Sequence, residues 1–509
     1  MSTTEHRGGV AAVLRAWAAS RPEAPFLIDG EDGRTWTFAA LDAVTDAVAA
    51  GLLGAGVRPG DRVGVILPNG PEIVMLFLAS LKIGAVFSPV NPAFTADEIA
   101  FIVANSDPRL VCTTAELAEK LTARETAPPP VHLVDEAAGA WFHPTARALA
   151  VPPPDAAAPA LILYTSGSTG RPKGAVLTHD NLLTNAREIA AWLALGRDDR
   201  VLCIMPLFHA NALVIGITTP LYCGGSSVVC RRFSASAFWP TVERHRPTTF
   251  GSVATILSML LARGGAPPAP DRHGLRFALC GSAPVPAELI HRFRGTTGIP
   301  VVEGYGLTEC TCRATFNPVD APRPGSVGLP IGNELRIADD DGAERGPGEV
   351  GEILLRGRNV MAGYFRAPEA TREALRGGWL HTGDLGHRTE EGFVYIAGRK
   401  SDMIIRGGEN IYPREIEDVL YALPGLEEAA VIGVPDPLYG EAVVACVARD
   451  RAGALTPERI LAHCRMHLAP FKIPVSIHVL DHLPRNATGK FDKHALRARL
   501  RPGPETSHG

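Results

Sequence analysis

A ten-residue segment, residues 165–174, contains the side chains of this chain best suited to bind phosphate. It reads Thr-Ser-Gly-Ser-Thr-Gly-Arg-Pro-Lys-Gly. Small residues let a backbone approach a ligand closely, and glycine tolerates positive φ. Hydroxyl and backbone N–H groups can face phosphate oxygens, and the lysine adds a fixed positive charge. The residues assigned to this role are Thr165, Ser166, Gly167, Ser168, Thr169, Gly170 and Lys173.

Two better-known phosphate loops are excluded. A Walker A loop has Gly immediately before its Lys and Ser or Thr after it, whereas Pro172 precedes Lys173 and Gly174 follows it. A dinucleotide fingerprint leads into a helix, whereas residues 174–177 have strand character. A flexible surface linker is the plain alternative, but such a linker rarely lies between two apolar strands, here residues 161–164 and 174–177.

Strand-like and helix-like segments alternate in the region before this loop. Residues 62–67 form an apolar strand, Pro68-Asn69-Gly70 is a turn signal, and residues 72–83 have a helical pattern that Gly84 ends. A strand resumes at residues 85–90. Strand, helix and strand in this order predict an α/β protein with parallel strands.

The length of 509 residues predicts more than one domain. After residue 399 the pattern changes: Pro413 opens an amphipathic helix, strand-like runs follow at residues 429–434 and 442–448, and Thr456-Pro457-Glu458 starts a second helix. A last strand is expected at residues 475–480. We therefore predict a large domain, residues 1–398, and a small α+β domain, residues 399–509, with a hinge near residues 399–402.

Composition limits the possible partners and location. The formal net charge is -4 and no basic stretch concentrates positive charge, so we expect no nucleic-acid partner. Nine cysteines lack metal-ligand spacing and fit a reducing cytoplasm. Residues 201–230 contain no Asp, Glu, Lys or Arg, but prolines and a Gly-Gly pair interrupt them. Because a spanning helix needs about 20 unbroken apolar residues, we expect no transmembrane segment.

Residues 164–174 closely resemble the signature loop of the adenylate-forming superfamily, which includes acyl-CoA synthetases, peptide-synthetase adenylation domains and luciferases. Other motifs of that family follow in the same order, and the resemblance spans nearly the whole chain. They are Pro206-Leu207-Phe208-His209, Gly281-Ser282-Ala283-Pro284, Gly304-Tyr305-Gly306-Leu307-Thr308-Glu309, Thr382-Gly383-Asp384, Gly398-Arg399-Lys400-Ser401-Asp402 and residues 484–490.

The resemblance implies an ATP-dependent carboxylic acid–CoA ligase. Such an enzyme adenylates the acid with release of pyrophosphate and then passes the acyl group to the CoA thiol with release of AMP. The implied cofactors are ATP, Mg²⁺ and coenzyme A. The implied fold is a large N-terminal domain of mixed parallel sheets with helices, followed by a small mobile α+β lid.

The matched motifs imply roles in binding the nucleotide. Tyr305 offers a flat face to adenine beside Gly306, with Gly281, Ser282 and Ala283 on the other side. Thr308 donates to the α-phosphate, and Glu309 holds Mg²⁺, which prefers oxygen ligands. Asp384 accepts hydrogen bonds from the ribose hydroxyls and Arg399 adds a second ribose contact. Lys490 reaches the α-phosphate and the substrate carboxylate, and is required for adenylation.

Family members rotate the small domain for the second half-reaction. The segment Gly407-Gly408-Glu409 would then line the channel for the CoA thiol. Ser401 stands at the hinge position, where the family usually has Asp or Lys, so either Ser401 or the adjacent Asp402 is expected to pivot.

A set of mostly small, apolar residues is expected to form the acid pocket. These residues are His209, Asn211, Val253, Ala254, Gly281, Gly306, Leu307 and Cys310. His209 either gates this pocket or is a buried histidine with satisfied hydrogen bonds. Relatives that take malonate have an arginine where this chain has Gly304, so a second carboxylate on the acid is not expected. Arg313, just beyond Cys310, could reverse that conclusion, but we expect it at the surface. We therefore predict a medium-sized apolar or aromatic acid.

Two other functions stay open on the sequence alone. The adenylate could pass to the phosphopantetheine of a carrier protein or to another nucleophile, although no carrier domain is fused to the chain. A non-catalytic nucleotide-binding relative is the second alternative. It is disfavoured because Lys173, Glu309 and Lys490 are all present.

Overall fold

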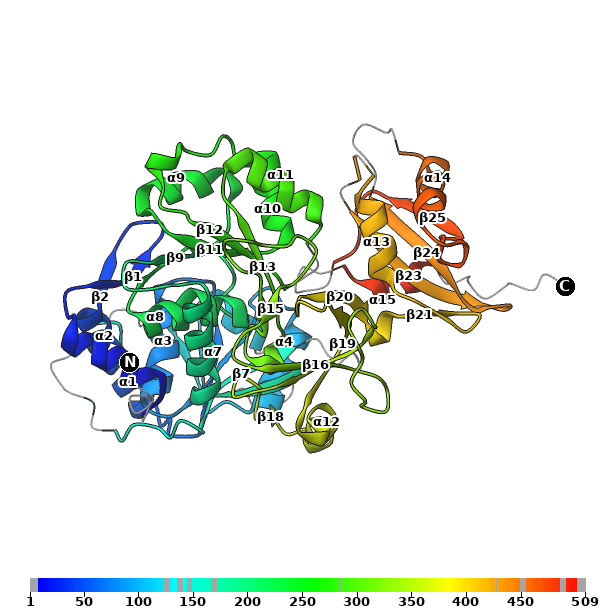
Figure 1. Cartoon of the computed structure of the whole chain (residues 1–509). Coiled ribbons are helices and arrows are strands. Elements are labelled where there is room, and N and C mark those ends of the chain that lie inside the picture. Colours follow the sequence, from blue (N-terminus) through cyan, green and yellow to red (C-terminus); the bar gives the residue numbers. More distant parts are fainter. Residues whose placement is uncertain are drawn as a thin grey trace. The chain divides into compact units, whose positions relative to one another are not determined.

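The computed structural model describes residues 8–121, 129–134, 141–143, 149, 151–165, 172–282, 285–423, 425–426, 428–448, 455–485 and 491–500. The chain divides into two compact units (Figure 1). The first comprises residues 1–285, 289–335 and 354–381, and the second comprises residues 286–288, 336–353 and 382–509. The predicted fold class, an α/β chain with a large first part and a smaller α+β second part, is confirmed. The predicted boundary between residues 398 and 399 stays a prediction.

The first unit contains a nine-stranded sheet of order β15-β14-β13-β12-β11-β9-β10-β1-β2. Its central neighbours, from β13 to β1, pair in parallel. The strands are β1 (Pro25–Asp29), β2 (Thr35–Thr37), β9 (Arg200–Cys203), β10 (Ser226–Val229), β11 (Thr249–Ser252), β12 (Phe277–Cys280), β13 (Val301–Tyr305), β14 (Thr315–Phe316) and β15 (Leu329–Pro330). Parallel strands end at one edge of a sheet, so the residues after β9, β11, β12 and β13 are gathered there.

A second sheet of the first unit has seven strands in the order β18-β8-β7-β4-β3-β5-β6. The strands are β3 (Arg62–Ile66), β4 (Val86–Pro89), β5 (Leu110–Thr113), β6 (Val131–Leu133), β7 (Pro159–Thr165), β8 (Lys173–Thr178) and β18 (Gly363–Tyr364). β3 and β4 pair in parallel, as predicted. Their connection is α3 (Pro71–Lys82), which starts with Pro71 and has Glu72 in its first turn, where a negative charge suits the helix dipole.

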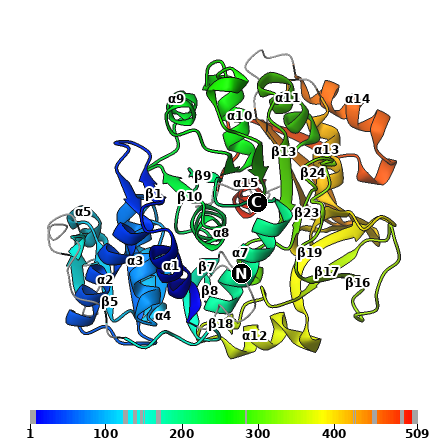
Figure 2. The same ribbon diagram turned by 60° about the vertical axis from the view of Figure 1, so that its left-hand side comes forward.

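Helices cover and separate these sheets. Figure 1 shows α9, α10 and α11 along one side of β9, β11 and β12. Figure 2 shows α7 and α8 beside each other between β9–β10 and β7–β8. The remaining bounds are α1 (Gly9–Ser20), α2 (Phe38–Gly54), α4 (Ala96–Ser106), α5 (Ala115–Ala118), η1 (Glu119–Leu121), α7 (His179–Trp192), η2 (Ala212–Thr218), α8 (Thr219–Cys223), α9 (Ala235–His245), α10 (Ala254–Arg263), η3 (Pro270–Arg272), α11 (Ala287–Thr297), η4 (Thr308–Cys310), α12 (Pro368–Ala374) and η5 (Arg376–Gly378).

The uncharged segment 201–230 folds into several short buried pieces, as predicted. They are β9, the π-helix η2, α8 and β10. Among the described residues, no helix combines the length and the apolar character that crossing a bilayer requires.

The second unit contains a five-stranded sheet of order β22-β21-β24-β23, with β25 added beside β24. A four-stranded sheet, β16-β17-β19-β20, precedes it, and residues 336–353 and 382–399 of that sheet belong to this unit. The bounds are β16 (Glu334–Ala338), β17 (Gly351–Arg356), β19 (Leu380–Arg388), β20 (Val394–Arg399), η6 (Lys400–Asp402), β21 (Ile404–Arg406), β22 (Glu409–Ile411), α13 (Pro413–Tyr421), β23 (Ala429–Asp436), β24 (Gly440–Ala448), α14 (Pro457–His467), η7 (Pro470–Lys472), β25 (Ser476–Leu480) and α15 (Lys493–Leu500).

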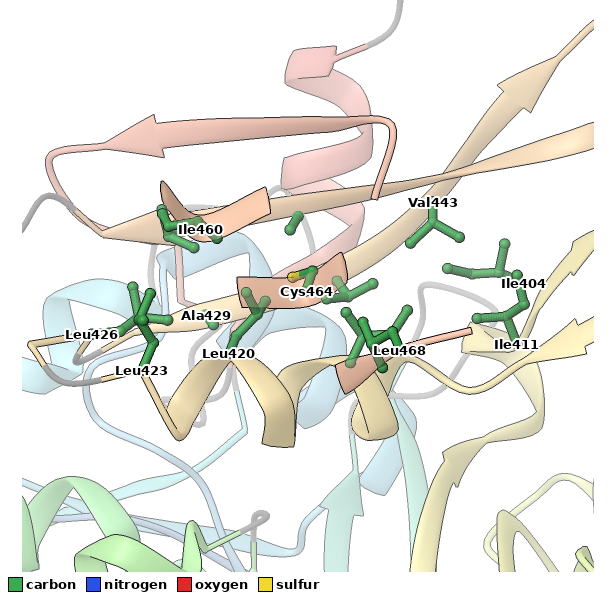
Figure 3. Packing of buried hydrophobic residues seen from close by; sticks show 14 residues of the cluster. Ile404, Ile411, Leu420, Leu423, Leu426, Ala429, Val443, Ile460, Cys464 and Leu468 are labelled. Carbon is green, nitrogen blue, oxygen red and sulfur yellow. The ribbon is translucent and has the colours of Figure 1, made fainter. Parts of the chain in front are cut away.

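Alternation along β23 builds two cores in this second unit. Ala429 and Val431 pack with Leu420 of α13 and Cys464 of α14, a cluster that Figure 3 shows from close by. Ala430 and the residues alternating with it pack on the opposite face, against α15. Successive strand residues point to opposite faces, so one strand serves both cores. The predicted helix starts are confirmed: α13 begins at Pro413, and the Thr456 hydroxyl caps α14 by accepting from the Arg459 N–H at 3.3 Å.

Candidate active site

The ends of the predicted phosphate loop form a hairpin in the seven-stranded sheet. Thr165, the last residue of β7, lies opposite Lys173, the first residue of β8, and the Thr165 hydroxyl donates to the Lys173 carbonyl at 3.4 Å. The loop therefore joins two strands, as the strand character of residues 174–177 predicted, and the structure shows that these strands are antiparallel. The predicted phosphate contacts of Ser166, Gly167, Ser168, Thr169 and Gly170 lie outside the described residues and stay predictions.

A tyrosine connects the loop lysine to the predicted metal-binding glutamate. The Lys173 Nζ lies 5.5 Å from the centre of the Tyr364 ring, a cation–π distance. The Tyr364 hydroxyl donates to Glu309 Oε1 at 2.8 Å. β18 carries Tyr364 and pairs with β8, which places Tyr364 opposite Ala175. A cation, an aromatic ring and a carboxylate from three separate segments thus form one continuous cluster.

The turn that carries Glu309 is tied down on both sides. The Glu309 carbonyl accepts from the Met361 N–H at 2.8 Å, and the Thr311 hydroxyl donates to the Asn359 carbonyl at 2.6 Å. Cys310 is fully buried, and burial raises the pKa of its thiol to about 12. Cys310 therefore stays a protonated packing residue and supplies neither a nucleophile nor a metal ligand.

The residues around Glu309 fit a magnesium ion shared with a phosphate ligand. Glu309 Oε1 accepts the hydrogen bond from the Tyr364 hydroxyl. Glu309 Oε2 makes no hydrogen bond or ion pair within the described part of the chain. No group of three or more His, Cys, Asp or Glu side chains that could cage a metal occurs among the described residues either. Mg²⁺ is commonly held by one or two carboxylates together with waters and substrate phosphates. The turn provides one such carboxylate, that of Glu309.

The predicted adenine-side residues lie at neighbouring strand ends. Gly281 and Ser282 follow β12, and Tyr305 ends the adjacent strand β13. A Cβ on Gly281 would stand 2.5 Å from the Gly304 carbonyl oxygen, so the close approach of the two strands requires glycine there. Ser282 adopts a left-handed φ of 67°, which is uncommon for a residue with a side chain. Ala283 lies outside the described residues.

The predicted acid-pocket residues follow four strands that are neighbours in the nine-stranded sheet. His209 and Asn211 come after β9, Val253 and Ala254 after β11, and Gly281 after β12. The others, Gly306, Leu307 and Cys310, come after β13. The fold therefore gathers the whole predicted set at one sheet edge, where ligands bind in open α/β sheets.

Two polar residues in this set differ in their surroundings. The ring of His209 is half-buried and lies 4.6 Å from that of Phe208. Asn211 is buried, and its Oδ1 lies 2.9 Å from where a Cβ on Gly251 would stand. The Asn211 Nδ2 donates to no other described residue. A buried amide without a partner is an exception in native proteins and calls for an explanation.

Arg313 is not at the surface, contrary to the prediction. Its side chain is 1% exposed, and Nε and Nη2 lack hydrogen-bond partners among the described residues. The chain reverses at Thr311, whose φ is 73°, and then enters β14, which pairs with β13. This reversal brings residue 313 back to the end of β13, where its backbone lies against Gly306, so the residue expected at the surface lies inside.

In the second unit, the predicted ribose residues form an ion pair. Asp384 of β19 lies opposite Arg399 of β20, and Arg399 Nε stands 2.9 Å from Asp384 Oδ1. The Asp384 carboxylate is 8% exposed and the Arg399 side chain 49% exposed, so the carboxylate is shielded while the guanidinium reaches solvent. Ser401 is exposed within η6, and Lys400 beside it binds Asp340 at 2.6 Å.

The residues predicted for the CoA channel lie at the tip of the β21–β22 hairpin. Gly407 and Gly408 have φ values of 60° and 88°, and they and Glu409 are exposed. No atom of the described residues lies within 4 Å of where a Cβ on Gly408 would stand. The Gly407 N–H donates to the Tyr439 carbonyl at 2.8 Å, which anchors the turn.

Lys490 lies outside the described residues. The residues on either side of segment 486–490 do pair: Arg485 and Phe491 form an antiparallel bridge, and the Arg485 guanidinium lies 4.5 Å from the Phe491 ring. The role of Lys490 stays a prediction.

Sequence reasoning missed Tyr364. It stands in a two-residue strand far along the chain from Glu309, and neither its spacing nor its neighbours in the sequence mark it. Only the pairing of β18 with β8 shows its place.

Comparisons with known proteins agree with this geometry. Residues 14–365 match the family of AMP-binding enzymes, and residues 415–490 match the AMP-binding enzyme C-terminal domain. A sulfoacetate–CoA ligase of Cupriavidus necator is 40% identical over 96% of this chain and 97% of that protein. A feruloyl-CoA synthase of an Amycolatopsis species is 39% identical over 92% of this chain and 94% of that protein. The crystal structure of ATP-bound MatB from Rhodopseudomonas palustris superposes with a TM-score of 0.89 at 33% identity, covering 97% of this chain and 99% of that one.

Proposed function

This chain belongs to the family of AMP-binding enzymes, and from that premise we propose the reaction that its described residues support. It is an ATP-dependent acid–CoA ligase. A carboxylate oxygen of the acid attacks the α-phosphorus of ATP, the bond to pyrophosphate breaks, and an acyl-adenylate forms. The CoA sulfur then attacks the acyl carbon, and AMP leaves.

The observation that carries this proposal is the cluster of Lys173, Tyr364 and Glu309. Adenylation gathers negative charge on the phosphates, so the protein must place positive charge and donors before the reaction begins. Lys173 supplies a cation at the end of the phosphate loop. Tyr364 holds one oxygen of Glu309 through a 2.8 Å hydrogen bond and so fixes the direction in which the other oxygen points.

Glu309 is the residue that would hold Mg²⁺. When bound, this ion neutralises charge on the phosphates. The Thr308 hydroxyl, from the same turn, donates to the α-phosphate. Tyr305 stacks on adenine, and Gly281 and Ser282 cover its other face.

Two further assignments complete the nucleotide contacts. Asp384 accepts hydrogen bonds from the ribose hydroxyls, and Arg399 orients Asp384 through their 2.9 Å ion pair. Lys490 contacts the α-phosphate and the reacting carboxylate.

We assign the second half-reaction to residues 399–509. These residues pivot near Ser401, and the exposed turn at Gly407 and Gly408 then guides the thiol. Both positions are glycine, which supports this assignment, because a pantetheine arm could then pass close to the backbone of the turn.

The two relatives described above are named for different acids, sulfoacetate and the feruloyl group, so the acid is to be identified by experiment. The decisive experiment is acid-dependent ATP–pyrophosphate exchange with the purified chain across aliphatic, aromatic, dicarboxylic and sulfonated acids, followed by CoA and mass detection of thioester. Exchange with thioester formation is the expected result.

Other outcomes would redirect the proposal. Exchange without thioester would move the acceptor to a carrier-protein phosphopantetheine or another nucleophile. ATP binding without exchange on any acid would favour the non-catalytic alternative. A matched Glu309→Gln variant distinguishes real exchange from a contaminating activity, because only exchange by this chain would depend on that residue.

A further inference from the structure

Among the described residues, the largest fully buried side chain is a charged one. Arg313 is 1% exposed, and within the described part of the chain no carboxylate lies at ion-pair distance from its guanidinium. Its Nε and Nη2 have no hydrogen-bond partner there. A buried, unpaired charge costs folding free energy unless something neutralises it. The mechanism above makes no use of this charge.

The backbone of Arg313 is firmly held. The Asn185 side chain accepts from the Arg313 N–H at 3.0 Å and donates to the Arg313 carbonyl at 2.7 Å. Asn185 is itself fully buried on α7. The Phe316 ring lies 5.5 Å from the guanidinium carbon and supports it from one side. The arginine is therefore positioned in advance, as a binding group should be.

The guanidinium lies beside Gly281, at a strand end that belongs to the predicted acid pocket. A Cβ on Gly281 would stand 2.9 Å from Arg313 Nη2, and a Cβ on Gly306 would stand 2.8 Å from the Arg313 Cα. Both glycines belong to the predicted acid pocket. Their missing side chains leave the space through which Arg313 runs.

A second unpartnered donor lies beside the adjacent strand of this sheet. Asn211, whose Nδ2 is buried without a described partner, lies 2.9 Å from the Cβ position of Gly251. Gly251 on β11 is in register with Leu279 on β12, two residues before Gly281. Arg313 thus lies beside the residue that follows β12, and Asn211 lies beside the adjacent strand β11.

We propose that Arg313 binds an anionic group at the far end of the acid, so that the substrates are short acids with a second carboxylate or a sulfonate. This rests on the proposed function and replaces the expectation of an apolar or aromatic acid. A guanidinium fork matches the paired oxygens of either anion. In the proposed reaction the reacting carboxylate lies beside Thr308 and the phosphates, and Lys173 neutralises charge on those phosphates. The anion that binds Arg313 is therefore a second anionic group of the acid.

The first test compares acids of similar length in ATP–pyrophosphate exchange: butanoate, succinate and 3-sulfopropanoate. We expect at least one of the two-anion acids to exceed butanoate in kcat/KM by about 100-fold. Arg313→Met should lower that value by about 100-fold, mainly through KM, and should change butanoate exchange much less. Arg313→Lys should recover part of the loss. Preference for butanoate, or an equal loss with all acids, would overturn the proposal.

The second test needs no turnover. In thermal unfolding without acid, Arg313→Met should match or exceed the unsubstituted protein in Tm, because an unpaired buried charge is removed. The preferred two-anion acid should raise the Tm of the unsubstituted protein and not that of Arg313→Met. Arg276→Met, which removes a half-exposed arginine paired with Asp199 at 2.7 Å, should keep the acid-induced rise.

The two tests separate this inference from the proposed function. A two-anion acid that raises Tm through Arg313 but supports no exchange would leave the anion site standing and remove the ligase function. Exchange without any effect of Arg313→Met on the choice of acid would keep the ligase and overturn the anion site. A lower Tm in both Arg313 variants, with the acid-induced rise intact, would make Arg313 a structural residue and also overturn it.

Discussion

The Glu309 turn and the β21–β22 hairpin are built in opposite ways. The turn, residues 308–311, is tied by hydrogen bonds to residues 359, 361 and 364, and its Cys310 is completely buried. The hairpin, residues 404–411, exposes Gly407, Gly408, Glu409 and Asn410, and half of the Ile405 side chain. Its tip is held by the Gly407 bond to Tyr439.

The difference matches the two half-reactions assigned to these regions. Adenylation depends on charges fixed in place before the reaction, so the turn must be rigid. Delivery of a thiol depends on access, and an exposed glycine turn with few buried contacts provides it. Substitutions in the turn should therefore damage adenylation, and substitutions in the hairpin should damage thioester formation.

The largest effect is expected at Lys490. This residue and the hairpin both belong to residues 399–509, but Lys490 is assigned to adenylation, so its substitution tests whether the two half-reactions can be separated within this part of the chain. Lys490→Ala should lower acid-dependent pyrophosphate exchange by about 1000-fold, because the reacting carboxylate loses its cation. Thioester formation from a supplied acyl-adenylate and CoA should stay within about twofold. Lys472→Ala, which removes a lysine paired with Glu415 at 2.6 Å, is the control. Equal loss of both steps would contradict the role.

Substitution of Glu309 tests whether the turn of residues 308–311 serves adenylation. Glu309→Gln should lower exchange by about 100-fold and shift its Mg²⁺ dependence to higher concentration, because a neutral amide is a weaker ligand. The control is Glu334→Gln, an exposed glutamate that binds Arg356. An unchanged Mg²⁺ titration curve would refute the metal role.

Substitution of Gly408 tests whether the exposed β21–β22 hairpin serves thioester formation. Gly408→Trp should slow thioester formation by about 20-fold while exchange continues, because bulk enters the proposed thiol path. Gly408→Ala imposes the same strain at a φ of 88° without the bulk. The channel assignment fails if the two variants behave alike, or if exchange falls as far as thioester formation.

The smallest effect is expected at Tyr364, and it tests whether the Tyr364 hydroxyl positions Glu309 in the turn. Tyr364→Phe should lower kcat/KM for exchange by about 5-fold, since one hydrogen bond to a charged group is lost. Tyr364→Leu should lower it further, because the ring beside Lys173 is lost as well. Identical values for Tyr364→Phe and the unsubstituted protein would show that the hydroxyl does not position Glu309.

Much of the fold could be predicted because its signals are local. The turn at residues 68–70, the proline that opens α3 and the cap at Thr456 each act within a few residues of the chain, and the elements begin where those signals stand. The phosphate loop is recognisable in the same way, from adjacent small and hydroxyl residues. The sequence alone therefore determined the α/β class, the order of the chemical motifs and the ATP-dependent reaction type.

Only the tertiary structure decided which distant residues complete the site. Tyr364 and Glu309 are 55 residues apart, and their contact depends on β18 pairing with β8. The sequence predicts Arg313 at the surface, yet the reversal at Thr311 and the space left by Gly281 put it inside. Charge and periodicity describe a residue's own preference, whereas burial is set by packing between segments that meet only after the chain has folded.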